Sequence, residues 1–146
     1  MLQTYKYRLY PIAIQKKSIE KHINACRLHN ILVWKKNNCT PNRWYMKNCE
    51  FVIFFHKGKS FPITNKNSSQ LLEYKNINGK QKLHPTQKPT DLIKELILNS
   101  SKENDIVFDP FCGSGSTLVS AKELNRNYLG IDNDEKYINI SLERLL

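Results

Sequence analysis

Residues 106–117 read Ile-Val-Phe-Asp-Pro-Phe-Cys-Gly-Ser-Gly-Ser-Thr, an apolar run that leads into a glycine-rich turn. The pattern predicts a strand, a tight turn and then a helix. Gly113 and Gly115 lack a Cβ, so the backbone there can adopt a positive φ and approach a ligand closely. Hydroxyl groups in the turn, with the free N–H groups at the start of the helix, can donate to a carboxylate or a phosphate. These hydroxyl groups belong to Ser114, Ser116 and Thr117.

A second predicted strand follows at residues 128–132 and ends in Asp132, where an acid is placed to accept the two hydroxyl groups of a ribose. A lone glycine-rich turn after a strand is often only a turn, but the second strand with its terminal acid favours a cofactor site. The third glycine of a G-x-G-x-x-G fingerprint is absent, because Leu118 stands at that position. This disfavours NAD and FAD and favours a smaller adenosyl ligand.

Residues 109–117 resemble the S-adenosylmethionine motif of the amino-group DNA methyltransferases, which make N6-methyladenine or N4-methylcytosine. Residues 84–89, His-Pro-Thr-Gln-Lys-Pro, look like the segment that precedes this motif in the permuted β-class of that family. Residues 42–58 are similar to a run common between the family's catalytic and cofactor motifs. The resemblance covers about residues 31–146, and it implies an α/β, Rossmann-like fold that uses S-adenosylmethionine as its cofactor.

The resemblance also implies roles for individual residues. Asp109 is expected at the amino end of the methionine portion of the cofactor, Phe111 beside the ligand and Asp132 at the ribose. Thr86 and Lys88 are expected at the carboxylate, where an ammonium acts as a point charge. By spacing alone Lys88 reads as a solvated loop lysine, and only the motif assigns it a role. The other expected cofactor-binding residues form the turn: Cys112, Gly113, Ser114, Gly115, Ser116 and Thr117.

One family motif is missing. These enzymes carry an Asp/Asn-Pro-Pro-aromatic loop, which holds the flipped target base, and the β-class places it upstream of the motifs found here. The sequence contains no Pro-Pro pair. The expected fold is therefore incomplete: it lacks the N-terminal catalytic strand and loop, and no catalytic residue is assigned.

Two functions follow from this pattern. The first is a site-specific, S-adenosylmethionine-dependent DNA methyltransferase that is truncated and inactive alone, with a second chain supplying the catalytic motif. Adenine N6 is preferred over cytosine N4 as the target, although that choice lies with the missing loop. The alternative is a non-catalytic relic, or a basic module that binds DNA or S-adenosylmethionine.

The first 30 residues point to a different origin. Lys-Tyr-Arg-Leu-Tyr-Pro at residues 6–11, followed by a basic helix to Cys26-Arg27, resembles the N-terminal helix-turn-helix segment of transposon OrfB-type proteins. A transposon–methyltransferase gene fusion would explain this. The expected organisation is thus a transposase-like segment at 1–30 and a partial methyltransferase domain at 31–146, with a loop at 60–83 and the cofactor-binding unit at 84–146.

Charge is unevenly distributed. Residues 1–88 hold 17 Lys and Arg against three Asp and Glu, whereas residues 89–146 hold six against ten. A basic half with interleaved Tyr and Trp is typical of a nucleic-acid partner, although a lysine-rich composition from an AT-rich genome is the alternative. The four cysteines form no C-x-x-C pair, so reduced thiols and no metal are expected. No apolar run reaches the length of a membrane span and no signal peptide is recognised, which favours the cytoplasm.

The apolar pattern predicts the remaining elements. Strands are expected at residues 31–34 and 50–56, the second with a hairpin through 57–59. A helix is expected from Pro89, with Leu92, Ile93, Leu96 and Ile97 on one face. Strand 105–109, helix 116–125, strand 127–132 and helix 134–145 then complete a βαβα unit.

Overall fold

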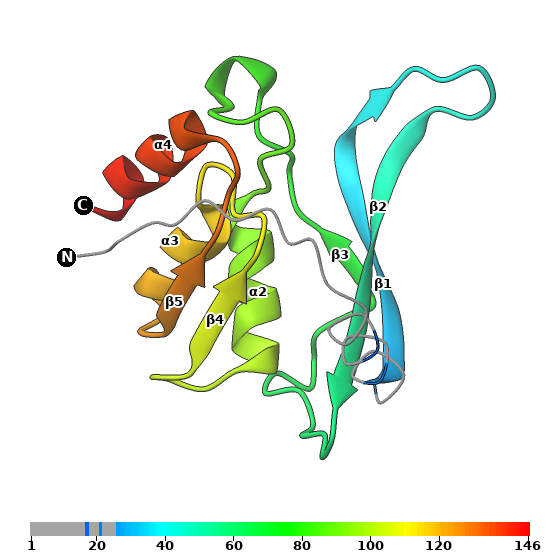
Figure 1. Ribbon diagram of the computed structural model, residues 1–146. Helices are drawn as coiled ribbons and strands as arrows, with labels where there is room; N and C mark the ends of the chain where they lie inside the picture. The colour runs from blue at the N-terminus through cyan, green and yellow to red at the C-terminus, as the bar shows by residue number, and fades with distance from the viewer. Residues whose placement is uncertain (1–16, 18–20, 22–25) are drawn as a thin grey trace.

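The computed structural model describes residues 17, 21 and 26–146 and arranges them around two sheets (Figure 1). A three-stranded sheet carries a long hairpin that projects from one side of the molecule, and a two-stranded parallel sheet lies on the other side. Helix α2, Thr90–Ser100, lies between the three-stranded sheet and the remaining helices. In the described part of the chain no helix is long and apolar enough to cross a membrane.

The hairpin consists of β1, Cys26–Thr40, and β2, Lys47–Lys57, which pair antiparallel with Ile31 opposite Ile53. The third strand, β3 (Leu71–Glu73), pairs with β1 in parallel. The two predicted apolar runs are therefore strands, but each strand extends beyond its run. Polar residues continue both strands because the antiparallel partner supplies their backbone hydrogen bonds, which a hydropathy pattern does not record.

Two sequence expectations about this region are wrong. The hairpin turn lies between β1 and β2 at residues 41–46, and not at 57–59, where the chain leaves β2. The segment 60–83 is not all loop, because it contains β3 and a 3-10 helix, η1, at Gly79–Gln81. Strand β3 forms in a polar segment because Leu72 pairs opposite Trp34 and is buried with it, a long-range contact that has no local signal.

The core of the first sheet is built on Trp34, which is 1% exposed and packs with Leu72 and with Leu92 of α2. Its indole Nε1 donates to the carbonyl oxygen of Tyr74 at 2.8 Å, so the buried polar atom is satisfied. Leu32, Tyr74 and Leu96 surround this cluster. This packing fixes α2 against the sheet and thereby places the segment just before α2.

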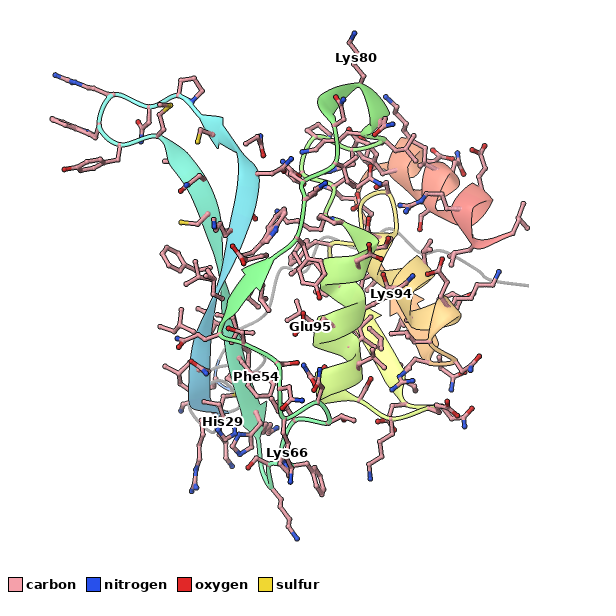
Figure 2. The ribbon with its side chains drawn as sticks, turned by 180° about the vertical axis from the view of Figure 1, so that it is seen from behind. His29, Phe54, Lys66, Lys80, Lys94 and Glu95 are labelled. Atoms are coloured by element: carbon pink, nitrogen blue, oxygen red, sulfur yellow. The ribbon has the colours of Figure 1, made fainter. Side chains whose placement is uncertain are left out.

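Helix α2 makes side-chain contacts on two opposite sides. Figure 2 shows Glu95 on the side toward the three-stranded sheet and Lys94 on the side toward α3. Glu95 accepts a hydrogen bond from the hydroxyl of Tyr74, while Lys94 forms an ion pair with Glu123 of α3 at 2.5 Å. The predicted helix after Pro89 is confirmed, and it connects the two sheets.

The predicted βαβα unit is also confirmed. Strand β4 (Ile106–Asp109), helix α3 (Ser116–Glu123), strand β5 (Asn127–Gly130) and helix α4 (Glu135–Leu145) follow one another, and β4 pairs with β5 in parallel. Because parallel strands point the same way, the glycine turn after β4 and the acid after β5 come to the same end of the sheet.

Among the described residues, helices cover one face of the β4–β5 sheet, and apolar side chains on its strands remain exposed. Ile106 is 71% exposed and Phe108 52% exposed, and within the described residues β4 pairs with β5 alone. Parallel strands are ordinarily buried on both faces. A row of apolar side chains on the outer face of β2 is also exposed to solvent: Phe51, Ile53 and Phe55 are all more than half exposed. Apolar side chains are thus exposed on one face of each sheet in the described part of the chain.

Candidate cofactor-binding site

A pocket of about 220 Å³ lies where the segment before α2 meets the end of β4, the glycine turn and the start of α3. It brings together nearly all of the cofactor-binding residues predicted from the sequence. Gly115 and Asp132 are the exceptions, because neither lines the pocket. The lining residues are His84, Thr86, Gln87, Lys88, Asp109, Phe111, Cys112, Gly113, Ser114, Ser116 and Thr117.

The glycine turn has the backbone geometry that the sequence predicts. Gly113 has φ 51° and Gly115 has φ 77°, a region that residues with a Cβ rarely adopt. A Cβ on Gly115 would lie 2.2 Å from Oγ of Ser141, and one on Gly113 would lie 3.4 Å from the ring of His84. The turn closes through a hydrogen bond from the N–H of Gly115 to the carbonyl of Cys112 at 2.8 Å. Both glycines are therefore required by conformation, and Gly115 also by space.

Asp132 supports the turn directly. Its Oδ2 accepts a hydrogen bond from the N–H of Gly113 at 2.8 Å, and its Oδ1 accepts from the N–H of Asp134 at 3.0 Å. Each carboxylate oxygen has a second lone pair, so these bonds leave acceptor capacity for a ligand hydroxyl. From α4, Nη1 of Arg144 donates to the carbonyl of Ser114 at 2.5 Å. Sequence reasoning missed the contact of Asp132 with Gly113 and that of Arg144 with Ser114, because each joins residues that are far apart in the chain.

Ser116 offers a donor that the protein itself does not use. The residue is 7% exposed, lines the pocket, and its Oγ has no hydrogen-bond partner among the described residues. A buried hydroxyl without a partner is costly, so it marks the place where a ligand acceptor would bind. The donor set at this end of the pocket, a serine hydroxyl beside the N-terminus of α3, suits a carboxylate.

Lys88 lies at the pocket but is already engaged. Its Nζ lies 2.5 Å from Oε2 of Glu50 on β2 and 5.7 Å from the centroid of the Trp34 ring. Glu50 also pairs with Lys36 of β1. Burial raises the pKa of Glu50, but hydrogen bonds from Lys36 and Lys88 outweigh it, so the pKa lies below its usual value. Residues 42–58 carry part of the family resemblance, yet no spacing in the sequence pairs Glu50 with Lys88.

Two side chains shape the rim. Phe111 is 87% exposed and follows Asp109, whose Oδ1 accepts a hydrogen bond from the N–H of Phe111 at 3.0 Å. The ring of His84 packs edge-on against that of Tyr137, with the two ring centroids 4.1 Å apart. Its Nδ1 accepts a hydrogen bond from the backbone N–H of Thr86 at 3.2 Å. An exposed aromatic ring beside an acid is a suitable boundary for a cationic, partly apolar ligand.

Cys112 lies within the pocket as a thiol. Burial raises its pKa to about 11, and the negative charges of Asp109 and Asp132 contribute to the rise. The group is therefore uncharged at neutral pH and adds an apolar wall. Within the described residues no three His, Cys, Asp or Glu side chains are grouped so that they could hold a metal ion.

The sequence profile described as DNA methylase, for the N6/N4 methyltransferases, matches residues 5–143. The chain belongs to this DNA methylase family. The match begins at residue 5 and so includes most of the first 30 residues, for which the sequence suggested another origin. Strand β1 runs without interruption across the expected boundary at residues 30 and 31. Before residue 26 the structure describes only residues 17 and 21, so most of the transposase-like segment lies outside the described residues and its assignment stays a prediction.

Relatives and solved structures agree with the family. The chain is 33% identical over 139 residues to the type II methyltransferase M2.LlaDCHI of Lactococcus lactis subsp. cremoris, covering 82% of this chain and 51% of the relative. It is 36% identical over 138 residues to the type II methyltransferase M.HinfI of Haemophilus influenzae, and this match covers 80% of this chain and 38% of the relative. The chain thus spans about half or less of these relatives.

A crystal structure of an M1.HpyAVI–SAM complex has the same fold. It superposes with a TM-score of 0.73 at 31% identity, covering 90% of this chain and 69% of that one. The expected Rossmann-like methyltransferase fold in partial form is therefore confirmed.

Proposed function

We propose that the chain is the cofactor-binding portion of an S-adenosylmethionine-dependent DNA amino-methyltransferase. The observation that carries this proposal is the buried, unpartnered hydroxyl of Ser116 at the end of a pocket built from a positive-φ glycine turn. In this assignment the pocket holds the methionine portion of the cofactor. When bound, that cofactor supplies an electrophilic methyl group for transfer to an exocyclic amino group.

The residues of the pocket then have distinct tasks. Thr86 and Lys88 bind the carboxylate, as expected from the sequence, and Ser116 adds a third donor to it. Asp109 binds the amino group of the methionine portion. Phe111 packs beside the ligand. Asp132 supports the turn through Gly113 and uses its spare lone pairs for the ribose. The roles other than that of Asp132 are supported by the positions of these residues around one pocket. Asp132 does not line the pocket, and its role is supported by its hydrogen bond to the turn and its remaining acceptor capacity.

DNA is the proposed substrate. The tip of the β1–β2 hairpin carries Arg43 over the ring of Trp44 at 5.2 Å, beside Tyr45, which is 93% exposed. Exposed aromatic rings next to cationic side chains suit contact with bases and phosphates. A DNA substrate also favours the cytoplasmic location expected from the sequence.

Methyl transfer needs groups that this sequence does not contain, since no Pro-Pro pair is present to build the base-holding loop. We propose that a second polypeptide segment supplies them. Adenine N6 remains the preferred target, although the residues that decide between adenine and cytosine belong to that segment.

Calorimetric titration with S-adenosylmethionine tests the cofactor assignment. The purified chain should bind with a micromolar dissociation constant, and Ser116→Ala should weaken binding by about fivefold through loss of one hydrogen bond. Ser100→Ala is the matched control, because that hydroxyl bonds to the carbonyl of Leu96 on α2, away from the pocket. A folded protein that gives no heat would reject the assignment and favour a basic module or relic that does not bind the cofactor.

A further inference from the structure

Two lysines and one glutamate meet beside the pocket. Glu50 uses both carboxylate oxygens, Oε1 for Lys36 and Oε2 for Lys88. Both ammonium groups also lie over the ring of Trp34, with Nζ at 5.3 Å from the centroid for Lys36 and 5.7 Å for Lys88. Two positive charges and one negative charge leave the cluster with a surplus of one positive charge.

The two lysines are not equivalent. The side chain of Lys36 is 16% exposed and does not line the pocket, whereas that of Lys88 is 37% exposed and lines it together with Ser116. Lys36 is thus the enclosed partner of Glu50, and Lys88 is the partner that can turn toward a ligand. Because Glu50 is partly buried, leaving its charge without a cation would be unfavourable, and Lys36 remains in place as that cation if Lys88 moves.

We propose that Glu50 and Lys36 are positioning residues that control how much of the Lys88 charge reaches a ligand carboxylate. This inference rests on the proposed function, because the carboxylate is that of the methionine portion of the cofactor. In the free protein Glu50 competes for Lys88. When a carboxylate enters beside Ser116, Lys88 turns from Oε2 to the ligand while Lys36 keeps Glu50 neutralised.

The proposal predicts changes of opposite sign. Glu50→Gln removes the competitor, so a ligand with a carboxylate should bind more tightly. Lys36→Met leaves Glu50 with Lys88 as its sole cation, so the same ligand should bind more weakly. A merely structural role would weaken binding in both variants, because each loses packing and an ion pair.

Comparing two ligands isolates the contribution of the carboxylate to binding. S-adenosylhomocysteine carries the amino acid portion, and 5′-methylthioadenosine lacks it. We expect Glu50→Gln to bind S-adenosylhomocysteine about three- to fivefold more tightly and Lys36→Met to bind it more weakly by a similar factor, as for a partly exposed ion pair. The affinity for 5′-methylthioadenosine should not change. Thermal unfolding without ligand checks that each variant is folded.

Lys35→Met is the matched control, since Lys35 is the neighbouring lysine on β1 and pairs with Glu73 at 2.7 Å, outside the cluster. It should leave both affinities unchanged. Shifts of the same sign in the two cluster variants, or equal shifts for both ligands, would overturn the inference while leaving the proposed function intact. If the wild-type chain binds neither ligand, the proposed function fails and the inference fails with it. If Glu50→Gln does not fold, the affinities of Lys36→Met and Lys35→Met for S-adenosylhomocysteine are compared instead. An unchanged affinity in Lys36→Met then rejects the inference.

Discussion

The N–H of Gly113 donates a hydrogen bond to Oδ2 of Asp132 at 2.8 Å, and this bond ties the turn after β4 to the end of β5. The contact makes one residue both a support of the glycine turn and a candidate ribose ligand. The two tasks are compatible because the second lone pair of the oxygen points away from the turn's N–H. Loss of Asp132 should therefore affect stability and binding together.

We expect Asp132→Ala to lower the free energy of unfolding by about 1–3 kcal/mol, because the N–H of Gly113 is left without its acceptor. Urea unfolding of the ligand-free protein measures this. Asp105→Ala is the control, since Asp105 also accepts from a backbone N–H, that of Lys102 at 2.8 Å, but at an exposed site. Equal losses in the two variants would contradict a special role for the turn.

Gly115→Ala should be strongly destabilising, by about 2–4 kcal/mol, because it combines a positive φ with overpacking. The added Cβ would lie 2.2 Å from Oγ of Ser141. Gly79→Ala serves as the control, since a Cβ there meets nothing within 4 Å and its φ is not positive. The midpoints of chemical unfolding for the two variants are compared. Adding Ser141→Gly to Gly115→Ala should restore part of the loss, and no restoration would mean that the backbone conformation dominates.

The ion pairs of Glu50 should appear in the pH dependence of stability. The pKa of this carboxyl is lowered in the folded protein, against an unfolded value of about 4.3. Its contribution is therefore present above the unfolded pKa and is lost as the pH falls through the folded pKa. The difference in unfolding free energy between wild type and Glu50→Gln should be constant near neutral pH and shrink below about pH 4. A difference that grows on acidification would contradict the assignment.

The hydroxyl of Tyr74 should ionise only at high pH. Burial raises its pKa to about 12, with the hydrogen bond to Glu95 and the charges of Glu95 and Asp91 adding to the rise. The stability that this hydroxyl provides is present below about pH 10 and is lost as the pH rises through the folded pKa. Absorbance at 295 nm across an alkaline titration reports the ionisation. The late step should be absent in Tyr74→Phe and move to lower pH in Glu95→Gln.

Cys112 should react more slowly with alkylating agents than Cys39 and Cys49, which are exposed. The raised pKa of the Cys112 thiol, about 11, leaves little thiolate at pH 8, and only the thiolate is nucleophilic. Peptide mass spectrometry after timed iodoacetamide treatment gives the rate at each site. In urea the three rates should converge, because the burial that raises the pKa is lost. Preferential labelling of Cys112 in the folded protein would contradict this.

Local patterns were sufficient for the unit around the cofactor pocket. The apolar run before the turn, the two glycines and the acid after the second strand predict β4, α3, β5 and their shared end, and the structure has them within a few residues. The reason is that a parallel βαβ unit is built from neighbouring segments. Its turn residues and the hydrophobic periodicity of its strands and helix therefore occur in one short stretch of sequence.

Contacts between distant segments could not be read in this way. Strand β3 exists because Leu72 meets Trp34, and the turn of the hairpin lies where β1 and β2 find their register. Glu50 reaches Lys88 across 38 residues. By itself the sequence determined the glycine turn and the elements on each side of it, because these follow from local conformational and hydrophobic preferences. Tertiary structure alone decided which charges face the pocket, because packing of α2 against Trp34 brings β2 and residues 84–88 together.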